Sequence, residues 1–190
     1  METALAPALI ARQFPRVNRR LRDLLLVVTG SLLVAALAQV RIPLPLTPVP
    51  ITGQTFAVLL VGAVLGSERG AFSLILYLVE GGLGLPFFAG GAGGLTHVFG
   101  PTGGYLLGFI AAAYLVGRLA ESGLDRRFRT SVLIFLAGEA IIYLFGVTWL
   151  GFFIGFQQAL AAGLLPFLPG DLFKLLAAAL VLPAGWRLAR

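Results

Sequence analysis

Cysteine is absent from the 190 residues, and histidine, methionine and lysine each occur once. The absence of cysteine excludes disulfides, thiolate metal sites and cysteine nucleophiles. The phosphate-binding loop G-x-x-x-x-G-K-[ST] needs a lysine after glycine, but Lys174 stands in DLFKLL. No G-x-S-x-G or H-E-x-x-H motif is present either. We therefore expect a binding protein without catalytic residues, metal or cofactor, and any active transport must use a partner's ATP hydrolysis.

Charged residues are scarce as well, because they make up 12% of the chain while hydrophobic residues make up 58%. The mean hydropathy of +0.96 leaves too little polar surface for a water-soluble globule. The net charge of +6 resembles a nucleic-acid signal until positions are considered. Apolar runs surround the basic clusters, which indicates membrane orientation. We predict an integral membrane protein that contacts the lipid bilayer and binds no nucleic acid.

Apolar runs divide the chain into a lead-in, residues 1–22, and a membrane domain, residues 23–190. Several runs have only about 16 residues, or roughly 24 Å of helix, against a hydrocarbon core of roughly 30 Å. Short helices end below the membrane surface, where irregular backbone is tolerated only beside protein or a water-filled cavity. We therefore expect an all-α protein with a recess. The six predicted transmembrane helices are 23–40, 52–66, 70–88, 103–118, 130–153 and 171–186.

Arginine positions predict the orientation of these helices. With six crossings, twelve of the arginines fall on one side, which the positive-inside rule makes cytoplasmic. Only Arg41 and Lys174 then lie outside, and both termini are cytoplasmic. The twelve are Arg12, Arg16, Arg19, Arg20, Arg22, Arg69, Arg118, Arg126, Arg127, Arg129, Arg187 and Arg190.

The predicted outer loops are rich in proline and glycine. They comprise residues 41–51, a glycine-rich tract from Gly81 to Gly94 that continues to Tyr105, and residues 164–170. Proline stiffens an extended chain, and glycine lets the backbone approach a ligand closely. We expect these loops to close over the recess.

Three linked motifs, GLPFFAGGAGG, GPTGGYLLGF and PFLPGDLFK, occur in that order, together with TPVPITGQTF and IYLFGVTWLG. From about Pro43 to Lys174 the chain resembles the biotin-specific substrate-binding (S) component, the BioY family, of energy-coupling-factor (ECF) vitamin transporters. The resemblance implies the six-helix ECF S-component fold, in a prokaryotic cell membrane, with biotin bound from outside. It also implies two kinds of partner, an integral membrane coupling subunit (T component) and two cytoplasmic ABC-type ATPase subunits.

The pair Asp171 and Lys174 enters an otherwise apolar run, and two interpretations apply to it. Asp171 as a helix N-cap is common, but a lysine in the first turn opposes the helix dipole by about 0.3–1 kcal/mol. Three residues apart on a helix, the two side chains share a face, and ionisable groups at membrane depth indicate function. We predict that both contact the ligand.

Biotin offers complementary chemistry, because its ureido ring has two N–H donors and a carbonyl acceptor. Asp171 accepts hydrogen bonds and Lys174 donates them, so we assign the pair to the ring. Contact between Lys174 and the tail carboxylate is the alternative. Between Gly81 and Gly108 there is no lysine or arginine. Arg41, His97 or backbone N–H groups are therefore the candidates for the carboxylate.

Other candidate ligand contacts each have a plain alternative. Gln54 is either a contact or an ordinary interfacial polar residue, and the two aromatic candidates are either contacts or belt and core residues. The four glycines either wrap the ligand or form a re-entrant turn. Tyr143 and Trp149 are expected to pack helices, and Glu139 is expected to be structural, bonded to Gln39 or protonated. The remaining candidates are Phe56, Gly90, Gly91, Gly93, Gly94 and Tyr105.

Small residues Ser31, Ala35 and Ala38 line one face of the first predicted membrane helix. Such a stripe lets membrane helices approach closely, so we predict docking on the coupling subunit, with packing inside this chain as the alternative.

Two other functions stay open at this point. One is an S component for thiamin or riboflavin, and the other is a membrane scaffold subunit without a ligand.

Overall fold

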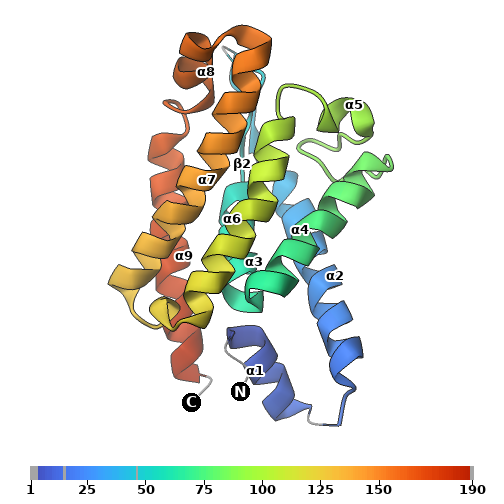
Figure 1. The fold of residues 1–190 in the computed structure, drawn as a ribbon, viewed down its shortest axis with the longest axis vertical. Helices are drawn as coiled ribbons and strands as arrows, with labels where there is room; N and C mark the ends of the chain where they lie inside the picture. The colour runs from blue at the N-terminus through green and yellow to red at the C-terminus, as the bar shows by residue number, and fades with distance from the viewer. Residues whose placement is uncertain (1–3, 15, 46, 189–190) are drawn as a thin grey trace.

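The computed structural model describes residues 4–14, 16–45 and 47–188, and it shows a helical bundle with one two-stranded hairpin (Figure 1). Strand β1 pairs antiparallel with β2, placing Arg41 opposite Thr52. In chain order the elements are α1 (Leu5–Gln13), α2 (Arg19–Ala38), β1 (Arg41–Ile42), β2 (Ile51–Thr52), α3 (Gln54–Leu65), α4 (Ser67–Gly82), α5 (Leu95–Val98), α6 (Gly103–Glu121), η1 (Leu124–Arg126), α7 (Phe128–Ile154), α8 (Phe156–Gly163) and α9 (Leu168–Leu188).

Each segment predicted from an apolar run is a helix, namely α2, α3, α4, α6, α7 and α9. In the part of the chain that the structure describes, α2, α6, α7 and α9 are long and apolar enough to cross a membrane. Helix α3 has 12 residues. That length gives about 18 Å, well short of a bilayer core of about 30 Å. The predicted short helix is therefore confirmed.

Two helix boundaries differ from the prediction in ways that matter for the site. Helix α4 ends at Gly82, not near residue 88, and the glycine-rich loop starts directly after it. Helix α9 begins at Leu168, three residues before Asp171. Pro169 fits this earlier start, because proline is tolerated in the first helical turn, where its missing N–H has no partner to lose.

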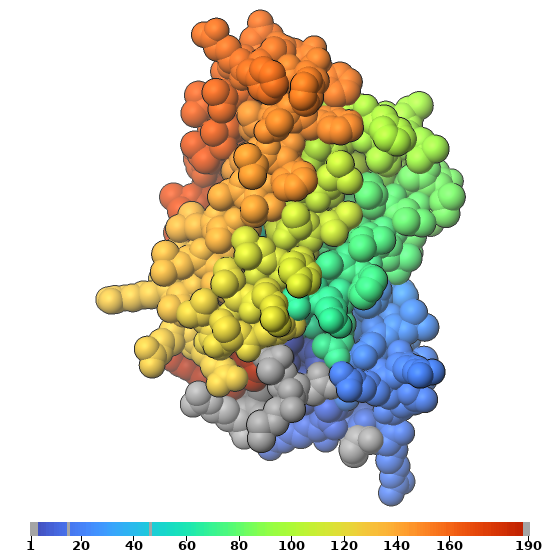
Figure 2. Space-filling view, in the orientation of Figure 1, coloured from blue at the N-terminus to red at the C-terminus, as the bar shows by residue number. Residues whose placement is uncertain are grey.

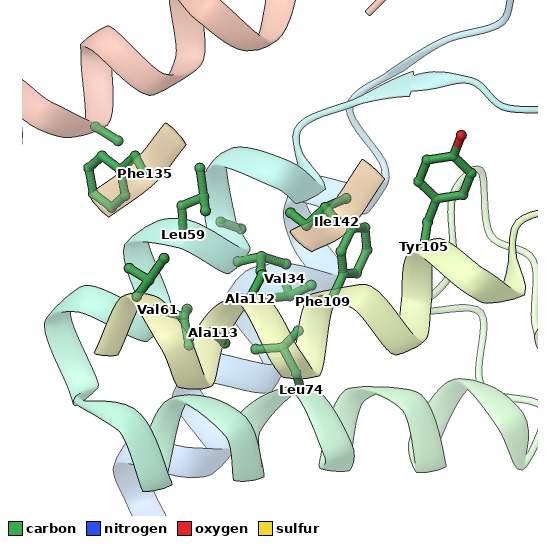
Figure 3. Packing of buried hydrophobic residues seen from close by; sticks show 14 of the residues in the cluster. Val34, Leu59, Val61, Leu74, Tyr105, Phe109, Ala112, Ala113, Phe135 and Ile142 are labelled. Carbon is green, nitrogen blue, oxygen red and sulfur yellow. The ribbon is translucent and has the colours of Figure 1, made fainter. Parts of the chain in front are cut away.

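Helix α3 lies at the centre of the bundle and packs against α2, α4, α6, α7 and α9. Small residues allow this approach, because a Cβ added to Gly62 would lie 2.6 Å from the backbone oxygen of Ala113 in α6. Large apolar side chains fill the surrounding space (Figure 3), among them Val34, Leu59, Leu74, Phe109, Phe135 and Ile142.

The outer surface of the bundle is also apolar. Phe72 on α4, Leu133 and Leu144 on α7, and Phe173 on α9 are each more than half exposed. Figure 2 shows the face that α4, α6 and α7 form together. Leucine and phenylalanine in such number outside a core are typical of a surface solvated by lipid.

The segment 1–22 is more than the predicted lead-in, because it contains helix α1. Leu5 is buried, and its Cδ2 atom would lie 2.7 Å from a Cβ added to Gly185 of α9. Ala4 is buried as well and approaches Gly66, just after α3. Helix α1 therefore covers the end of the bundle that the short α3 does not reach.

The bundle has two chemically different ends. Helix α1, the starts of α2, α4 and α7, and the ends of α6 and α9 lie together at one end, here called the basic end (Figure 1). Eleven of the twelve arginines predicted to share a side lie on or next to these segments, and Arg190 lies outside the described residues. The hairpin, α5 and α8 form the other end, here called the hairpin end. The hairpin end contains Arg41, and Lys174 bonds to Thr52 of its strand β2.

Candidate functional site

A recess of about 170 Å³ opens at the hairpin end, above the N-terminus of α3. A cavity of this size holds roughly a dozen waters or one small organic molecule. The recess therefore meets the expectation that short helices leave a cavity. Its lining residues are Arg41, Pro48, Val49, Pro50, Thr52, Gln54, Thr55, Ala89, His97, Thr102, Tyr105, Leu106, Phe109, Ile142, Tyr143, Phe167, Asp171 and Lys174.

Asp171 and Lys174 meet in this recess as a nearly buried ion pair. Lys174 Nζ lies 2.8 Å from Asp171 Oδ1, with the lysine side chain 18% exposed and the aspartate 7%. Lys174 also donates to the backbone oxygen of Thr52 at 2.6 Å and to Thr55 Oγ1 at 3.2 Å. All three N–H donors of the ammonium are thus used within the protein. A ligand acceptor must replace one of them, and the 3.2 Å bond is the longest.

The carboxylate of Asp171 is held from three sides. Oδ1 accepts from Lys174 and from Thr55 Oγ1, which lies 3.1 Å away, while Oδ2 accepts from the hydroxyl of Tyr143. A carboxylate offers about four acceptor positions, so one position on Oδ2 remains for a ligand N–H. Tyr143 was expected to pack helices only, but it lines the recess and holds Asp171.

The N-cap interpretation of Asp171 is wrong. Because α9 begins at Leu168, Asp171 lies inside the first turn, and its backbone N–H donates to Phe167 O at 2.9 Å as in a continuing helix. Its side chain bonds to α3, α7 and Lys174 and does not cap a backbone N–H. The pair is therefore held by tertiary contacts.

Gln54 and Tyr105, two of the predicted ligand contacts, also line the recess. The side chain of Gln54 donates to the hydroxyl of Tyr77 at 2.7 Å, and Tyr77 donates to Phe87 O at 3.2 Å. Tyr105 donates to Gly163 O at 2.7 Å, which ties α6 to the end of α8. Tyr105 and Phe109 project from the same side of α6 (Figure 3). The two predicted residues thus connect the recess wall to the loops above it.

Phe56 and the four predicted glycines are not among the residues that line the recess as the structure describes it. Phe56 is two residues after Gln54 on a helix, which turns it to another side, where it packs on the core. Gly90 and Gly91 have φ of +74° and +76°, so they form the turn of the loop. A Cβ on Gly90 would also collide with the guanidinium of Arg41.

Two nitrogen-bearing side chains stand at the rim of the recess, Arg41 of β1 and His97 of α5. His97 stacks on Phe88 with ring centroids 5.0 Å apart, and burial lowers the pKa of His97. The neutral imidazole is therefore favoured, whereas Arg41 is exposed and permanently charged. Arg41 is therefore a stronger candidate than His97 for contact with a ligand carboxylate.

The expected bond between Glu139 and Gln39 is not formed. Gln39 donates to the backbone oxygens of Ala35 and of the loop residues 86–88. Glu139 is 6% exposed, and neither of its oxygens has a hydrogen-bond partner among the described residues. Trp149 packs helices as expected, and its Nε1 donates to Gly100 O at 2.9 Å.

The stripe Ser31, Ala35 and Ala38 is buried, with exposures of 0%, 6% and 0%. Helix α2 packs on α3 and α4, and the Ser31 hydroxyl donates to Glu80 of α4. This arrangement favours the alternative interpretation, packing inside the chain. A partner could reach the stripe only after α2 separated from α4.

Comparisons with known proteins agree with one another. The family model described as the BioY family matches residues 10–190. A biotin transporter BioY of Thermotoga maritima is 43% identical over 141 residues, which are 74% of this chain and 82% of the relative. The probable biotin transporter BioY of Pyrococcus horikoshii is 40% identical over 141 residues, 74% of this chain and 83% of its own. A biotin transporter BioY of Rhizobium etli is 36% identical over 170 residues, which cover 84% of this chain and 90% of the relative.

A solved structure is similar as well. It is described as the crystal structure at 2.1 Å of the S-component for biotin from an ECF-type ABC transporter. It aligns with a TM-score of 0.79 and 26% sequence identity, covering 88% of this chain and 92% of that chain.

Proposed function

The chain belongs to the BioY family, and on that premise we propose that its recess binds biotin as the S component of an energy-coupling-factor transporter. The observation that carries this proposal is the buried Asp171–Lys174 pair, which presents an acceptor and a donor side by side at 2.8 Å. A ureido ring needs both at that spacing, because its N–H and C=O groups are neighbours. The protein is a transport subunit and not an enzyme.

In the proposed pose a ureido N–H donates to Asp171 Oδ2, and the ureido oxygen accepts from Lys174. That oxygen takes the place of Thr55 on Lys174, which exchanges the 3.2 Å bond for one of similar kind. Tyr105, Phe109 and Ile142 offer apolar surface for the thiophane ring and the valeryl chain. Gln54 supplies a further polar contact at the floor.

We assign the tail carboxylate to Arg41. With Lys174 committed to the ring, Arg41 is the charged donor that lines the recess. It stands on the hairpin opposite Thr52, whose backbone oxygen already holds Lys174. The hairpin therefore connects both ends of the ligand, and Gly90 leaves room for the guanidinium.

We further propose six membrane crossings, with the basic end cytoplasmic and the recess outside. The alternating direction of α2, α3, α4, α6, α7 and α9 and the arginines at one end support this orientation. The parent lacks cysteine, so single variants can be labelled cleanly. Leu83→Cys, at an 83% exposed site in the hairpin-end loop, should react with an impermeant thiol reagent in intact cells. Ser122→Cys, after α6, should react only after lysis, and the reverse pattern would contradict the orientation.

The sequence has no P-loop motif, so any active transport through this chain must use ATP hydrolysis by partners. We propose an integral membrane coupling subunit and two cytoplasmic ATPase subunits. Docking through the Ser31, Ala35 and Ala38 stripe stays a prediction. Ala35→Leu and the neighbouring exposed Ala36→Leu form a matched pair. If the stripe docks on the coupling subunit, Ala35→Leu should fold but no longer copurify with that subunit. Ala36→Leu should still copurify with it.

Mass spectrometry of small molecules released from the purified protein tests the function directly. After incubation with an equimolar mixture of biotin, thiamin and riboflavin, we expect biotin alone to be retained. Retention of another vitamin would assign a different substrate to the same fold. Retention of none of them by monodisperse protein would favour a scaffold role.

A further inference from the structure

Glu139 stands out among the buried groups that the proposed function does not use. In the part of the chain that the structure describes, it is the one carboxyl group whose two oxygens are both buried without a hydrogen-bond partner. It is the twelfth residue of α7, so it lies about 16 Å along a helix that begins at the basic end. That depth is close to the middle of a hydrocarbon core of about 30 Å.

The side chain of Glu139 faces the protein interior. Phe135 and Ile142, at i−4 and i+3 on the same helical face, are both 0% exposed and point into the core (Figure 3). Glycine at position 138 lets Leu59 of α3 and Val116 of α6 approach closely. An ionised carboxylate is costly where no described residue donates a hydrogen bond to it, so the neutral acid is the favoured form.

Glu139 is also near the ligand pair. It lies one turn before Tyr143, which donates to Asp171. Asp171 in turn bonds to Lys174, so Glu139 lies one helical turn from the tyrosine that holds the pair. Helix α6 contributes the neutral Tyr105 to this region, α3 contributes Gln54 and Thr55, and α8 has no charged side chain. Asp125 and Arg126 of η1 lie at the basic end, before α7 begins and away from Glu139.

The net charge of Asp171, Lys174 and Glu139 depends on whether Glu139 carries a proton. With Glu139 neutral, Asp171 and Lys174 balance each other, whereas an ionised Glu139 adds a second negative charge with one lysine to serve both. We propose that Glu139 is a proton-binding site beside the recess, whose bound proton keeps the ligand pair neutral and whose loss weakens biotin binding. This inference rests on the proposed function.

The sign of the effect follows from linkage. If biotin prefers the protonated form, raising the pH through the titration of Glu139 lowers biotin affinity by at most tenfold per pH unit. The difference between the parent and Glu139→Gln therefore isolates Glu139, because glutamine is neutral at every pH.

Calorimetric titration with biotin, from neutral to alkaline pH, tests the proposal on parent, Glu139→Gln and Glu80→Gln. Glu80 is the matched control, because it accepts from Ser31 and lies outside the recess lining. We expect Glu139→Gln to bind within about twofold of the parent at neutral pH. The parent should then weaken by about tenfold relative to Glu139→Gln as the pH rises, and Glu80→Gln should follow the parent. Parallel profiles for parent and Glu139→Gln would overturn the proposal, as would a dependence on sodium in place of pH.

Infrared spectroscopy gives a readout that does not need biotin. The parent at neutral pH should show the C=O stretch of a protonated carboxylic acid, and Glu139→Gln should lack it. If glutamine prevents folding, Glu139→Met serves in its place, because an apolar side chain of similar size suits a buried site. Absence of biotin binding by every variant would refute the proposed function, whereas absence of the infrared band in the parent would refute the proton site alone.

Discussion

Two ion pairs of the same chemistry stand at opposite ends of the molecule. Lys174 Nζ and Asp171 Oδ1 are 2.8 Å apart at the hairpin end, and Arg69 Nε and Asp23 Oδ1 are 2.8 Å apart at the basic end. Each cation is 18% exposed, but Asp23 is 33% exposed while Asp171 is 7% exposed. Distance therefore does not distinguish the pairs, and burial does.

The difference in surroundings explains what each pair does. Asp171 receives further hydrogen bonds from Thr55 and Tyr143 and faces the recess. Asp23 has a second cation, Arg19, at 3.8 Å, whose side chain is 77% exposed. Exposed pairs contribute about 0–1 kcal/mol, whereas removing one partner of a buried pair costs about 3–5 kcal/mol. We infer that the basic-end pair joins α2 to α4, and that the hairpin-end pair is kept for a ligand.

The largest expected effect comes from Asp171→Asn. The amide loses the charge that holds Lys174 and turns a donor toward it, so biotin affinity should fall by about 100-fold or more. Asp23→Asn, the same change in the other pair, should leave affinity within about twofold. Calorimetry on protein checked for monodispersity measures both. Equal effects from the two substitutions would contradict the distinction drawn between the pairs.

A double variant separates folding from binding at this pair. Asp171→Asn combined with Lys174→Met removes the stranded charge, so thermal stability should recover relative to Asp171→Asn alone. Biotin binding should not recover, because no donor or acceptor for the ureido ring returns. Recovery of both would mean that the pair only stabilises the fold.

Arg41→Gln should have the next largest effect, and only on ligands with a carboxylate. Loss of one charge-assisted hydrogen bond at an exposed rim weakens biotin by about tenfold. Biotin amide, whose tail is neutral, should bind Arg41→Gln and the parent with similar affinity. Competition binding with both ligands measures this. An equal loss for the two ligands would place Arg41 away from the carboxylate.

Tyr143→Phe should have a smaller effect. It removes one donor from Asp171 without changing charge or packing, so we expect biotin affinity to fall about 3- to 10-fold. The matched control is Tyr114→Phe on α6, a half-exposed tyrosine outside the recess lining. Calorimetric titration of both variants decides the point, and unchanged binding by Tyr143→Phe would show that Lys174 and Thr55 are sufficient to hold Asp171.

The smallest effect is expected from glycines near the rim. Gly90→Ala and Gly91→Ala both introduce a side chain at positive φ, which costs about 1–2 kcal/mol of stability in each. Only the Cβ at position 90 meets Arg41, since nothing lies within 4 Å of a Cβ at position 91. Gly90→Ala should therefore bind biotin about two- to threefold more weakly than Gly91→Ala. Melting curves and titrations of the two variants test this.

Much of the fold could be predicted from the sequence because apolar runs are unambiguous in a chain with few charges. The pair Asp171 and Lys174 stood out for the same reason. The short helices α1, α5 and α8 could not be predicted from apolar runs, and the contact between Leu5 and Gly185 has no local sequence signal.

The partners of the pair were harder to foresee. Tyr143 is 28 residues from Asp171, and Thr52 is 122 residues from Lys174, so no local spacing connects them. Tyrosine on an apolar helix is typical of packing, and a backbone oxygen such as that of Thr52 has no sequence signal at all. Pro169 did carry a signal for the start of α9, and with it the N-cap interpretation could have been rejected.

The central claim is that Lys174 recognises the ureido ring of biotin and not its tail. Titrating Lys174→Met and the parent with biotin and with biotin amide tests it most directly, because the two ligands differ only at the tail. We predict that Lys174→Met weakens both ligands equally, by about tenfold or more. A loss confined to biotin would move Lys174 to the carboxylate. Binding of both ligands within about twofold of the parent, well under 1 kcal/mol, would contradict the site itself.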